Sequence, residues 1–374
     1  MTMPTRRHFI RQLSIASSLG LIASAGLNPL RVFAADEDDW FMPDEGERQR
    51  HAWIAFGAQE AIWEDFTGDV QEALGRIARA IARFQPVTVL CRSDERELAE
   101  ELCGGANVRF LETALDDIWM RDIGANFLTT EDGGLTALDF NFNGWGGKQQ
   151  HGKDARVAAF MARDVGARYL RSELVGEGGG IEVDGHGTGI MTESCWVNGN
   201  RNPDWTRAEV EEELKACLGL RKIIWLPGIR GKDITDAHVD FYARFVSPGV
   251  VVANLDTDPD SYDHAVTQRH LEILRNATDA DGRRLKVHVL SPPLKPRRSR
   301  FNRDNPDFAA GYINYFVING AVIMPQFGDA EADRKARDLL EELYPDREIV
   351  ALDIDAIAAG GGGIHCVTHQ LPWV

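Results

Sequence analysis

Cysteine is scarce in this sequence, and positive charge and long apolar runs are also in short supply. Its 374 residues include 41 lysines and arginines against 58 aspartates and glutamates, a formal net charge of −17. This balance makes nucleic acid an unfavourable partner and favours a cationic ligand. With 44% hydrophobic residues, the chain is long enough to bury a sizeable core. The few cysteines exclude a disulfide scaffold, and their odd number leaves at least one thiol unpaired; they are Cys91, Cys103, Cys195, Cys217 and Cys366.

The N-terminus has the pattern of an export signal. Two adjacent arginines, Arg6 and Arg7, precede a mildly apolar run at residues 13–27 that serine and glycine interrupt. The run is too short to span a membrane, and small residues follow it at a suitable cleavage point. We therefore predict a twin-arginine export signal at residues 1–35, the alternative being a tail with a chance arginine pair. Residues 36–374 would form a single domain that works in the periplasm or outside the cell, without stable membrane insertion.

Turn signals divide the rest of the chain into about five similar units. Each signal lies between two runs rich in β-forming residues and is followed by a helical pattern and a further strand. For example, residues 331–344 place apolar side chains on one face of a helix, and residues 348–354 follow as a strand. The signals are Asp132-Gly133, Asp184-Gly185, Pro248-Gly249 and Asn319-Gly320.

The two ends of the chain are expected to meet. The first unit has only one early strand, at residues 52–56, and the last strand, at residues 364–369, is not followed by a helix. Pairing of these two strands would complete the first unit and close the units into a ring. The sequence thus predicts an α/β fold built from ββαβ units.

Five polar residues recur at corresponding points of these units, so a ring would gather them at one end of its axis. His238 and Asp240 are two residues apart, and in a strand they would point to the same side. An imidazole would then lie beside a carboxylate in mostly apolar surroundings. The set comprises Asp122, Glu177, His238, Asp240 and Cys366.

Taken singly, these residues also have less specific interpretations. Cys366 follows four glycines at 360–363, which let the backbone approach a ligand closely, so its thiol is either a nucleophile or a buried structural group. Glu177 precedes three glycines and is either a site residue or a solvated loop acid. Asp122 is either a site residue or part of a salt-bridged surface turn. Trp119 is either a core residue or a lid over a flat cation.

The other cysteines and the basic residues near position 300 indicate no second site. Cys195 and Cys217 have apolar neighbours and are expected in the core. Cys91 and Cys103 flank a short helix and would be either core residues or a disulfide. The basic loop at residues 295–303 is interpreted as solvated, with an anionic partner as the alternative.

Several motifs together resemble the agmatine deiminase family, which groups agmatine deiminases with the bacterial type of peptidylarginine deiminase. The resemblance runs from about residue 45 to the C-terminus and implies a five-fold pseudo-symmetric α/β propeller of the pentein type. Its motifs are Asp-Asp-x-Trp-x-Arg-Asp at 116–122, Phe-Asn-Gly-Trp-Gly-Gly at 142–147, Glu-Gly-Gly at 177–179, His-Val-Asp at 238–240 and Gly-Gly-Ile-His-Cys at 362–366.

The resemblance implies a covalent mechanism. Cys366 would be the nucleophile and His238 the acid–base group, with Glu177 supporting His238. A free thiol has a pKa of roughly 8.5, so the substrate cation or His238 must favour the thiolate. Attack on a guanidinium carbon, loss of ammonia and hydrolysis of an S-linked amidino intermediate would give a ureido product. This chemistry requires neither a metal nor an organic cofactor.

The resemblance also implies how the substrate is held. Asp122 and Asp240 would grip the planar guanidinium, Trp119 would pack over it, and Gly363 would line the same site. The sequence departs from the family pattern at three places that we expect to shape the pocket for the far end of the substrate, namely Phe56-Gly57, Ala125 and Glu182.

The expected reaction is conversion of agmatine to N-carbamoylputrescine and ammonia, a step of polyamine biosynthesis toward putrescine. The first alternative is deimination of arginine in peptides, and the second is a non-catalytic exported binder of polyamines or arginine. An amidino transferase would need an acceptor amine. A zinc hydrolase is disfavoured because His365 and His369, in a strand, would point away from Cys366; its ligands would be those three residues and His238.

Overall fold

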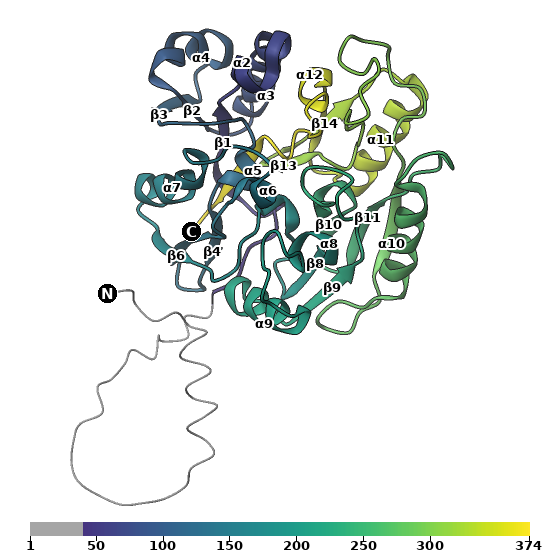
Figure 1. The fold of residues 1–374 in the computed structure, drawn as a ribbon. Helices are drawn as coiled ribbons and strands as arrows, with labels where there is room; N and C mark the ends of the chain where they lie inside the picture. The colour runs from purple at the N-terminus through teal and green to yellow at the C-terminus, as the bar shows by residue number, and fades with distance from the viewer. Residues whose placement is uncertain (1–39) are drawn as a thin grey trace, which may run out of the picture.

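The computed structural model describes residues 40–374, so the predicted export signal at residues 1–35 lies outside the described residues. The described chain forms five small mixed sheets that follow one another around a central axis (Figure 1). In every sheet an antiparallel strand pair is extended by a parallel strand, which the chain reaches through an outer helix. The predicted five-fold α/β propeller of ββαβ units is confirmed.

The first sheet joins the two ends of the described chain. Strand β16 (Thr368–Pro372) pairs antiparallel with β1 (Gln49–Phe56), so the predicted closure of the ring is confirmed. Parallel strands β2 (Val87–Cys91) and β3 (Val108–Glu112) extend this sheet. Its helices are α2 (Glu60–Trp63), α3 (Thr67–Ala82) and α4 (Arg96–Cys103).

The other four sheets have three strands each. Their strands are β4 (Asn126–Thr129), β5 (Leu135–Asp139) and β6 (Arg168–Arg171); β7 (Glu182–Val183), β8 (Thr188–Thr192) and β9 (Lys222–Leu226); β10 (Ala243–Ser247), β11 (Val250–Asn254) and β12 (Lys286–Leu290); and β13 (Phe316–Ile318), β14 (Ala321–Gln326) and β15 (Glu348–Asp353). The longer helices between them are α7 (Val157–Val165), α9 (Arg207–Leu218), α10 (His264–Asn276) and α11 (Ala330–Leu343). Short helices are α5 (Met120–Ile123), α6 (Gly144–Gly147), α8 (Glu193–Trp196) and α12 (Asp355–Ala358).

The four predicted turns form the four hairpins within these sheets. Each turn glycine has a left-handed φ, between 69° and 87°, which a residue with a Cβ rarely adopts. These glycines therefore set the register in which each antiparallel pair begins, and they are Gly133, Gly185, Gly249 and Gly320.

Two predicted strands begin later than expected, and both differences affect the site. His238 and Asp240 do not share a strand face: the short 3₁₀ helix η5 (Val239–Phe241) lies there, and β10 begins only at Ala243. The cause is a sharp turn at Asp236 and Ala237, whose φ values are 63° and 70°. Residues 360–367 likewise form turns and loop, so Cys366 precedes β16 rather than lying within a strand.

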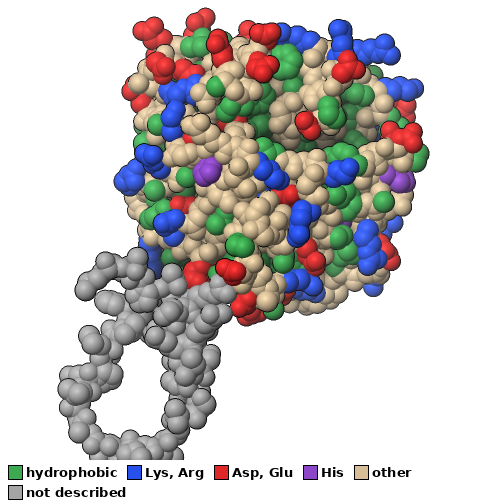
Figure 2. Space-filling model, in the orientation of Figure 1, with side chains coloured by type: hydrophobic (Ala, Val, Ile, Leu, Met, Phe, Trp, Pro, Cys, Tyr) green, Lys and Arg blue, Asp and Glu red, His purple; other side chains and the backbone are tan. Residues whose placement is uncertain are grey.

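Burial agrees with most of the predictions about ordinary core residues. The described cysteines are all buried with free thiols, so Cys91 and Cys103 are core residues without a disulfide. In the basic loop, Arg297 pairs with Asp353 and Asp355, and Arg300 pairs with Asp69. On the face shown in Figure 2, acidic and basic side chains are interspersed. Within residues 40–374 no helix is long and apolar enough to cross a membrane.

Candidate active site

The five predicted site residues come from separate segments and meet at the centre of the ring. Asp122 lies on α5, which is near the centre of the view in Figure 1. Glu177 precedes the 3₁₀ helix η4 (Gly178–Gly180), His238 and Asp240 lie at η5, and Cys366 lies in the loop before β16. All five side chains are buried. As the sequence analysis predicted, contacts bring these residues together, linking Asp122, His238 and Glu177 in one group and Asp240 and Cys366 in another.

His238 lies between two carboxylates. Its Nε2 is 3.1 Å from Glu177 Oε2, and its Nδ1 is 3.7 Å from Asp122 Oδ1. Burial alone would lower the pKa of His238, but the charge of Asp122 and the contacts with Cys195 and Glu177 outweigh it and raise this pKa well above its ordinary value. The imidazole is therefore protonated at neutral pH and can act as an acid.

Glu177 is held by an arginine that sequence analysis did not single out. Arg201 Nε lies 2.9 and 3.0 Å from the two carboxylate oxygens, and both side chains are fully buried. Burial would raise the pKa of Glu177, but Arg201 and His238 lower it below its ordinary value. Arg201 also donates from Nη1 to Asp236 Oδ2 at 2.8 Å. The only signal in the sequence was its place in the stretch Asn-Arg-Asn-Pro at 200–203.

Asp122 is fixed by two further donors. Trp145 Nε1 donates to its Oδ2 at 2.9 Å, and the Gly179 backbone N–H donates to its Oδ1 at 3.0 Å. Trp145 reaches this position because its backbone is left-handed, with φ 55°. Burial raises the pKa of Asp122 to about 6, although His238 and Trp145 act in the opposite direction. Asp122 therefore changes its charge close to neutral pH.

Asp240 presents one oxygen without a partner. Its Oδ2 accepts a hydrogen bond from His365 Nδ1 at 2.8 Å and lies 3.6 Å from Cys366 Sγ. Its Oδ1 is buried and has no hydrogen-bond partner. A buried carboxylate oxygen without a donor is costly unless a ligand supplies one. Burial would raise the pKa of Asp240, but the hydrogen bond with His365 and the charges of His238 and Arg244 lower it.

Cys366 is the most exposed of the five described cysteines, at 8%. Burial, followed by the charges of Asp240 and Asp122, raises the pKa of its thiol well above the ordinary value. The thiol is therefore protonated at neutral pH. The Cys366 backbone N–H donates to Asn314 Oδ1 at 3.3 Å, and a Cβ on Gly363 would lie 2.5 Å from the same oxygen. Gly363 thus lets the loop pack on Asn314.

Trp119 packs against the glycine loop that precedes Cys366. Its indole N–H donates to Asp117 Oδ2 at 2.9 Å, and its ring leaves no room for a side chain on Gly362. Trp63 donates to the other Asp117 oxygen at 2.7 Å, and the two indole rings are 5.8 Å apart. The two tryptophans therefore pack against one side of the loop. Most of the surface of Trp119 is in such contacts, as expected of a core residue.

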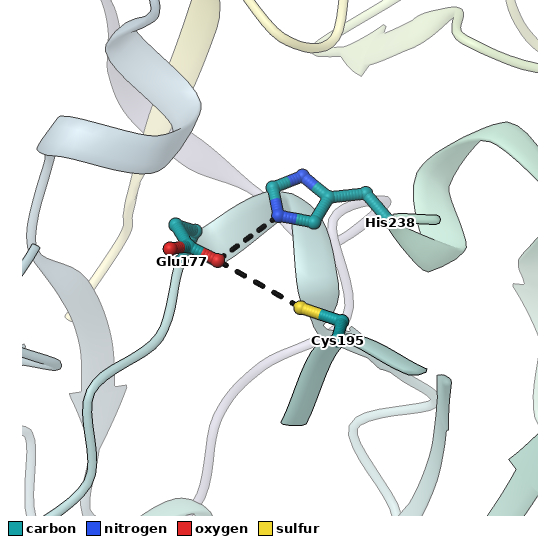
Figure 3. Close-up of side chains that lie close together, drawn as sticks. All are labelled: Glu177, Cys195 and His238. Atoms are coloured by element: carbon teal, nitrogen blue, oxygen red, sulfur yellow. Dashed lines mark hydrogen bonds and ion pairs between the residues drawn. The ribbon is translucent and has the colours of Figure 1, made fainter. Parts of the chain in front are cut away.

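Cys195 is closer to the site than its sequence context suggested. It is fully buried as predicted, but its Sγ lies 3.7 Å from Glu177 Oε2, the oxygen that also binds His238 (Figure 3). The possible ligand atoms of Glu177, Cys195 and His238 all lie within 4.8 Å of one another. Within residues 40–374 this is the only group of side chains with metal-binding spacing. Because Arg201 already donates to both oxygens of Glu177, a metal cation there would face a buried guanidinium.

The zinc alternative drawn from the sequence does not match the contacts of its histidines. His365 binds the carboxylates of Asp240 and Glu45, and His369 Nδ1 lies 3.0 Å from the Gln370 carbonyl oxygen. Neither histidine shares a group of metal-binding spacing with Cys366 among the described residues. These side chains serve the hydrogen-bonding network of the core.

The three departures from the family pattern lie in packed surroundings. Glu182 accepts from Arg244 Nε at 2.9 Å and from the Phe245 backbone N–H at 2.6 Å, so its carboxylate is committed to the core. Phe56 and Ala125 are fully buried. The expectation that Glu182 shapes a substrate pocket is therefore wrong.

A cysteine, a histidine and paired carboxylates at the centre of a five-bladed α/β propeller define a class of proteins, the guanidine-modifying penteins. The chain belongs to the Porphyromonas-type peptidyl-arginine deiminase family, whose model matches residues 41–372. It is accordingly a hydrolase that acts on the C–N bonds of amidines.

Similar proteins and solved structures support this assignment. The agmatine deiminase of Pseudomonas aeruginosa is 35% identical over 354 residues, covering 90% of this chain and 96% of that protein. The structure of the agmatine deiminase of Enterococcus faecalis is similar with a TM-score of 0.85 and 31% identity, covering 91% of this chain and 98% of that one. A C. jejuni agmatine deiminase with substrate bound has a TM-score of 0.79 and 25% identity, covering 89% and 96%.

Proposed function

We propose that this protein hydrolyses agmatine to N-carbamoylputrescine and ammonia through a covalent intermediate on Cys366. The observation that carries the proposal is the free, buried Oδ1 of Asp240, on a carboxylate whose other oxygen lies 3.6 Å from the thiol. A guanidinium bound to this carboxylate would bring its central carbon next to Cys366 Sγ. The names of the relatives, including one with substrate bound, support a small guanidino substrate.

A guanidinium cation would complement the charge of this site. Asp122 and Asp240 are both buried, and the planar guanidinium can donate N–H bonds to carboxylates on two sides. Its charge would offset the two carboxylates that raise the pKa of Cys366, so binding favours loss of the thiol proton to solvent. The nucleophile would therefore form only when substrate is present.

His238 supplies protons in the order that the chemistry needs. The thiolate attacks the guanidinium carbon, and the protonated imidazole of His238 donates to the departing ammonia. The imidazole, now neutral, takes a proton from water as that water attacks the S-linked amidino carbon. Collapse of this second tetrahedral centre, with loss of its hydroxyl proton to solvent, releases the ureido product and regenerates the thiolate. Glu177 keeps His238 oriented throughout.

Deimination of arginine in peptides is the second candidate, and the family description favours it. The two substrates share the guanidinium and differ at the far end, where agmatine carries an amine and arginine a backbone. The chemical groups described above serve both equally. A direct comparison of substrates is therefore required.

The test is release of ammonia and ureido product by residues 36–374, with agmatine, free arginine and an arginine-containing peptide as substrates. We expect turnover of agmatine, and a loss of at least a thousand-fold in kcat for Cys366→Ala. Cys103→Ala, a buried cysteine on the outer helix α4, is the matched control and should retain activity. Turnover of the peptide alone would replace the proposal with the second candidate. Binding without any turnover would favour a non-catalytic binder.

We also propose that residues 1–35 direct export by the twin-arginine route. The support is the arginine pair and apolar run described above, together with the start of the family match at residue 41. The test is fractionation of bacterial cells that express the full chain or its Arg6→Lys/Arg7→Lys variant. We expect the periplasmic fraction to contain the first protein and to lack the second; equal distribution would contradict export by this route.

A further inference from the structure

His365 lies between two buried carboxylates, immediately before the proposed nucleophile. Its Nδ1 is 2.8 Å from Asp240 Oδ2, and its Nε2 is 2.9 Å from Glu45 Oε2. The side chains of all three residues are at most 9% exposed. The contacts form one line from the segment before β1, through His365, to the carboxylate that faces Cys366.

Three further donors fix the carboxylate of Glu45, at the far end of this line of contacts. Its Oε1 accepts from Arg244 Nη2 at 2.7 Å and from the Val317 backbone N–H at 2.9 Å, and its Oε2 accepts from Arg121 Nη2 at 3.1 Å. These donors come from β10, β13 and α5, so three parts of the ring fix one carboxylate. Burial would raise the pKa of Glu45, but Arg244, His365 and Arg121 together hold it far below its ordinary value.

Both hydrogen bonds of His365 need a donor on the imidazole. A neutral imidazole has only one N–H, so it donates to one carboxylate at a time, and a proton on Nδ1 is the one that Asp240 Oδ2 accepts. Burial, followed by the charges of Arg121 and Arg244, lowers the pKa of His365 below its ordinary value, although Glu45 and Asp240 act in the opposite direction. The hydrogen bond from Nδ1 orients Asp240 Oδ2, which leaves Oδ1 as the oxygen available to a ligand.

We propose that His365 and Glu45 are positioning residues for Asp240: they fix its carboxylate so that Oδ1 faces the guanidinium while Oδ2 stays beside Cys366 Sγ. The inference rests on the proposed function, since it assumes that Asp240 binds a guanidinium. It adds two residues that touch neither substrate nor the reacting atoms. One of them, Glu45, lies only ten residues beyond the predicted export signal.

The chain permits a matched pair of substitutions at position 365. The amide nitrogen of His365→Asn replaces Nδ1, so it can donate to Asp240 but cannot reach Glu45. The amide of His365→Gln replaces Nε2, so it can reach Glu45 but leaves Asp240 Oδ2 without its donor. The two variants remove the same imidazole, and they differ in which carboxylate keeps its hydrogen bond.

The experiment measures KM and kcat for agmatine, and calorimetric binding of agmatine to the same variants combined with Cys366→Ala. We expect His365→Gln to weaken binding and raise KM about ten-fold or more, with a smaller change in kcat, because a charged hydrogen bond is lost. His365→Asn should stay within about three-fold of wild type. Glu45→Gln should fall between them. Thermal unfolding of each variant establishes that it is folded.

Two outcomes separate this inference from the proposed function. If Cys366→Ala alone binds agmatine but the Asn and Gln variants lose equal affinity, or neither loses any, the positioning role is overturned and the function stands. If Cys366→Ala alone binds neither agmatine nor an arginine-containing peptide, and wild type turns over neither, the proposed function fails and this inference fails with it.

Discussion

Arg201 donates from a single nitrogen, Nε, to both carboxylate oxygens of Glu177, at 2.9 and 3.0 Å, with both side chains fully buried. This contact leaves Glu177 ionised and turned toward His238. Arg201 is held in turn by Asp236, which also accepts from Lys148 Nζ at 2.8 Å. Opposite charges therefore alternate from the surface to the imidazole, and each depends on its neighbour.

Removal of Arg201 should destabilise the fold as well as the site. Arg201→Met leaves Glu177 buried without its cation, and breaking a buried pair costs about 3–5 kcal/mol. Urea unfolding at neutral pH measures this loss. Arg207→Met is the control, because Arg207 pairs with Glu193 at the surface and should cost less than about 1 kcal/mol. Equal losses of unfolding free energy in the two variants would contradict the view that burial makes the Arg201–Glu177 pair important for stability.

Asp236 should make stability depend on pH on the acid side. Burial would raise its pKa, but hydrogen bonds from Lys148, Asn200 and Arg201 lower it to about 2, below the ordinary 3.8. The folded state therefore binds fewer protons than the unfolded state between these values, and stability is lost as pH falls from about 4 to about 2. Asp236→Asn should be less stable than wild type at pH 6 and should decline less steeply toward pH 3.

Urea midpoints at pH 6 and pH 3 measure this difference. Asp346→Asn changes an exposed aspartate and serves as the control, which should follow the wild-type curve. If the urea midpoints of wild type and Asp236→Asn fell equally from pH 6 to pH 3, Asp236 would not contribute to the loss of stability at low pH.

The pH profile of activity should report Asp122. Since its pKa is raised to about 6, kcat/KM for agmatine should rise with pH through this value as the carboxylate forms. Trp145→Phe removes an N–H that stabilises the ionised form, so the rise should move to higher pH, by roughly half a unit to one unit. Trp225→Phe loses an indole bond to Glu211 outside the site and is the matched control. If kcat/KM of Trp145→Phe rose at the same pH as that of wild type, ionisation of Asp122 would not be the origin of the rise.

The order of the fold could be predicted because its signals are local. A turn glycine, a run of β-forming residues and the apolar face of a helix each lie within about fifteen residues, and α11 (Ala330–Leu343) differs by one residue from its predicted range. The five candidate site residues could be proposed because they lie at corresponding points of the units and in motifs that resemble those of the agmatine deiminase family. Closure of the ring followed from an unpaired strand at each end.

The local geometry of the site could not be predicted in the same way. The strand expected through His238 and Asp240 is replaced by η5, which follows left-handed backbone at Asp236 and Ala237, and neither residue is a glycine that would have signalled it. The partners Arg201 and Trp145 depend on contacts between different loops. Position in the sequence does not show that these side chains point inward. Only the packed ring brings such donors to buried carboxylates.

Gly179 provides the sharpest test of how closely the site is packed. A Cβ at this position would lie 2.5 Å from His238 Nδ1 and 2.8 Å from Asp122 Oδ1, so Gly179→Ala must displace one of these side chains. We expect kcat/KM to fall at least a hundred-fold while the unfolding temperature changes little, because the displaced groups act on substrate rather than on the core. Gly68→Ala, on α3 with no atom within 4 Å of the added Cβ, should leave activity unchanged. If Gly179→Ala were as active as Gly68→Ala, His238 and Asp122 would not need their present separation, and the proposed roles of both residues would have to be abandoned.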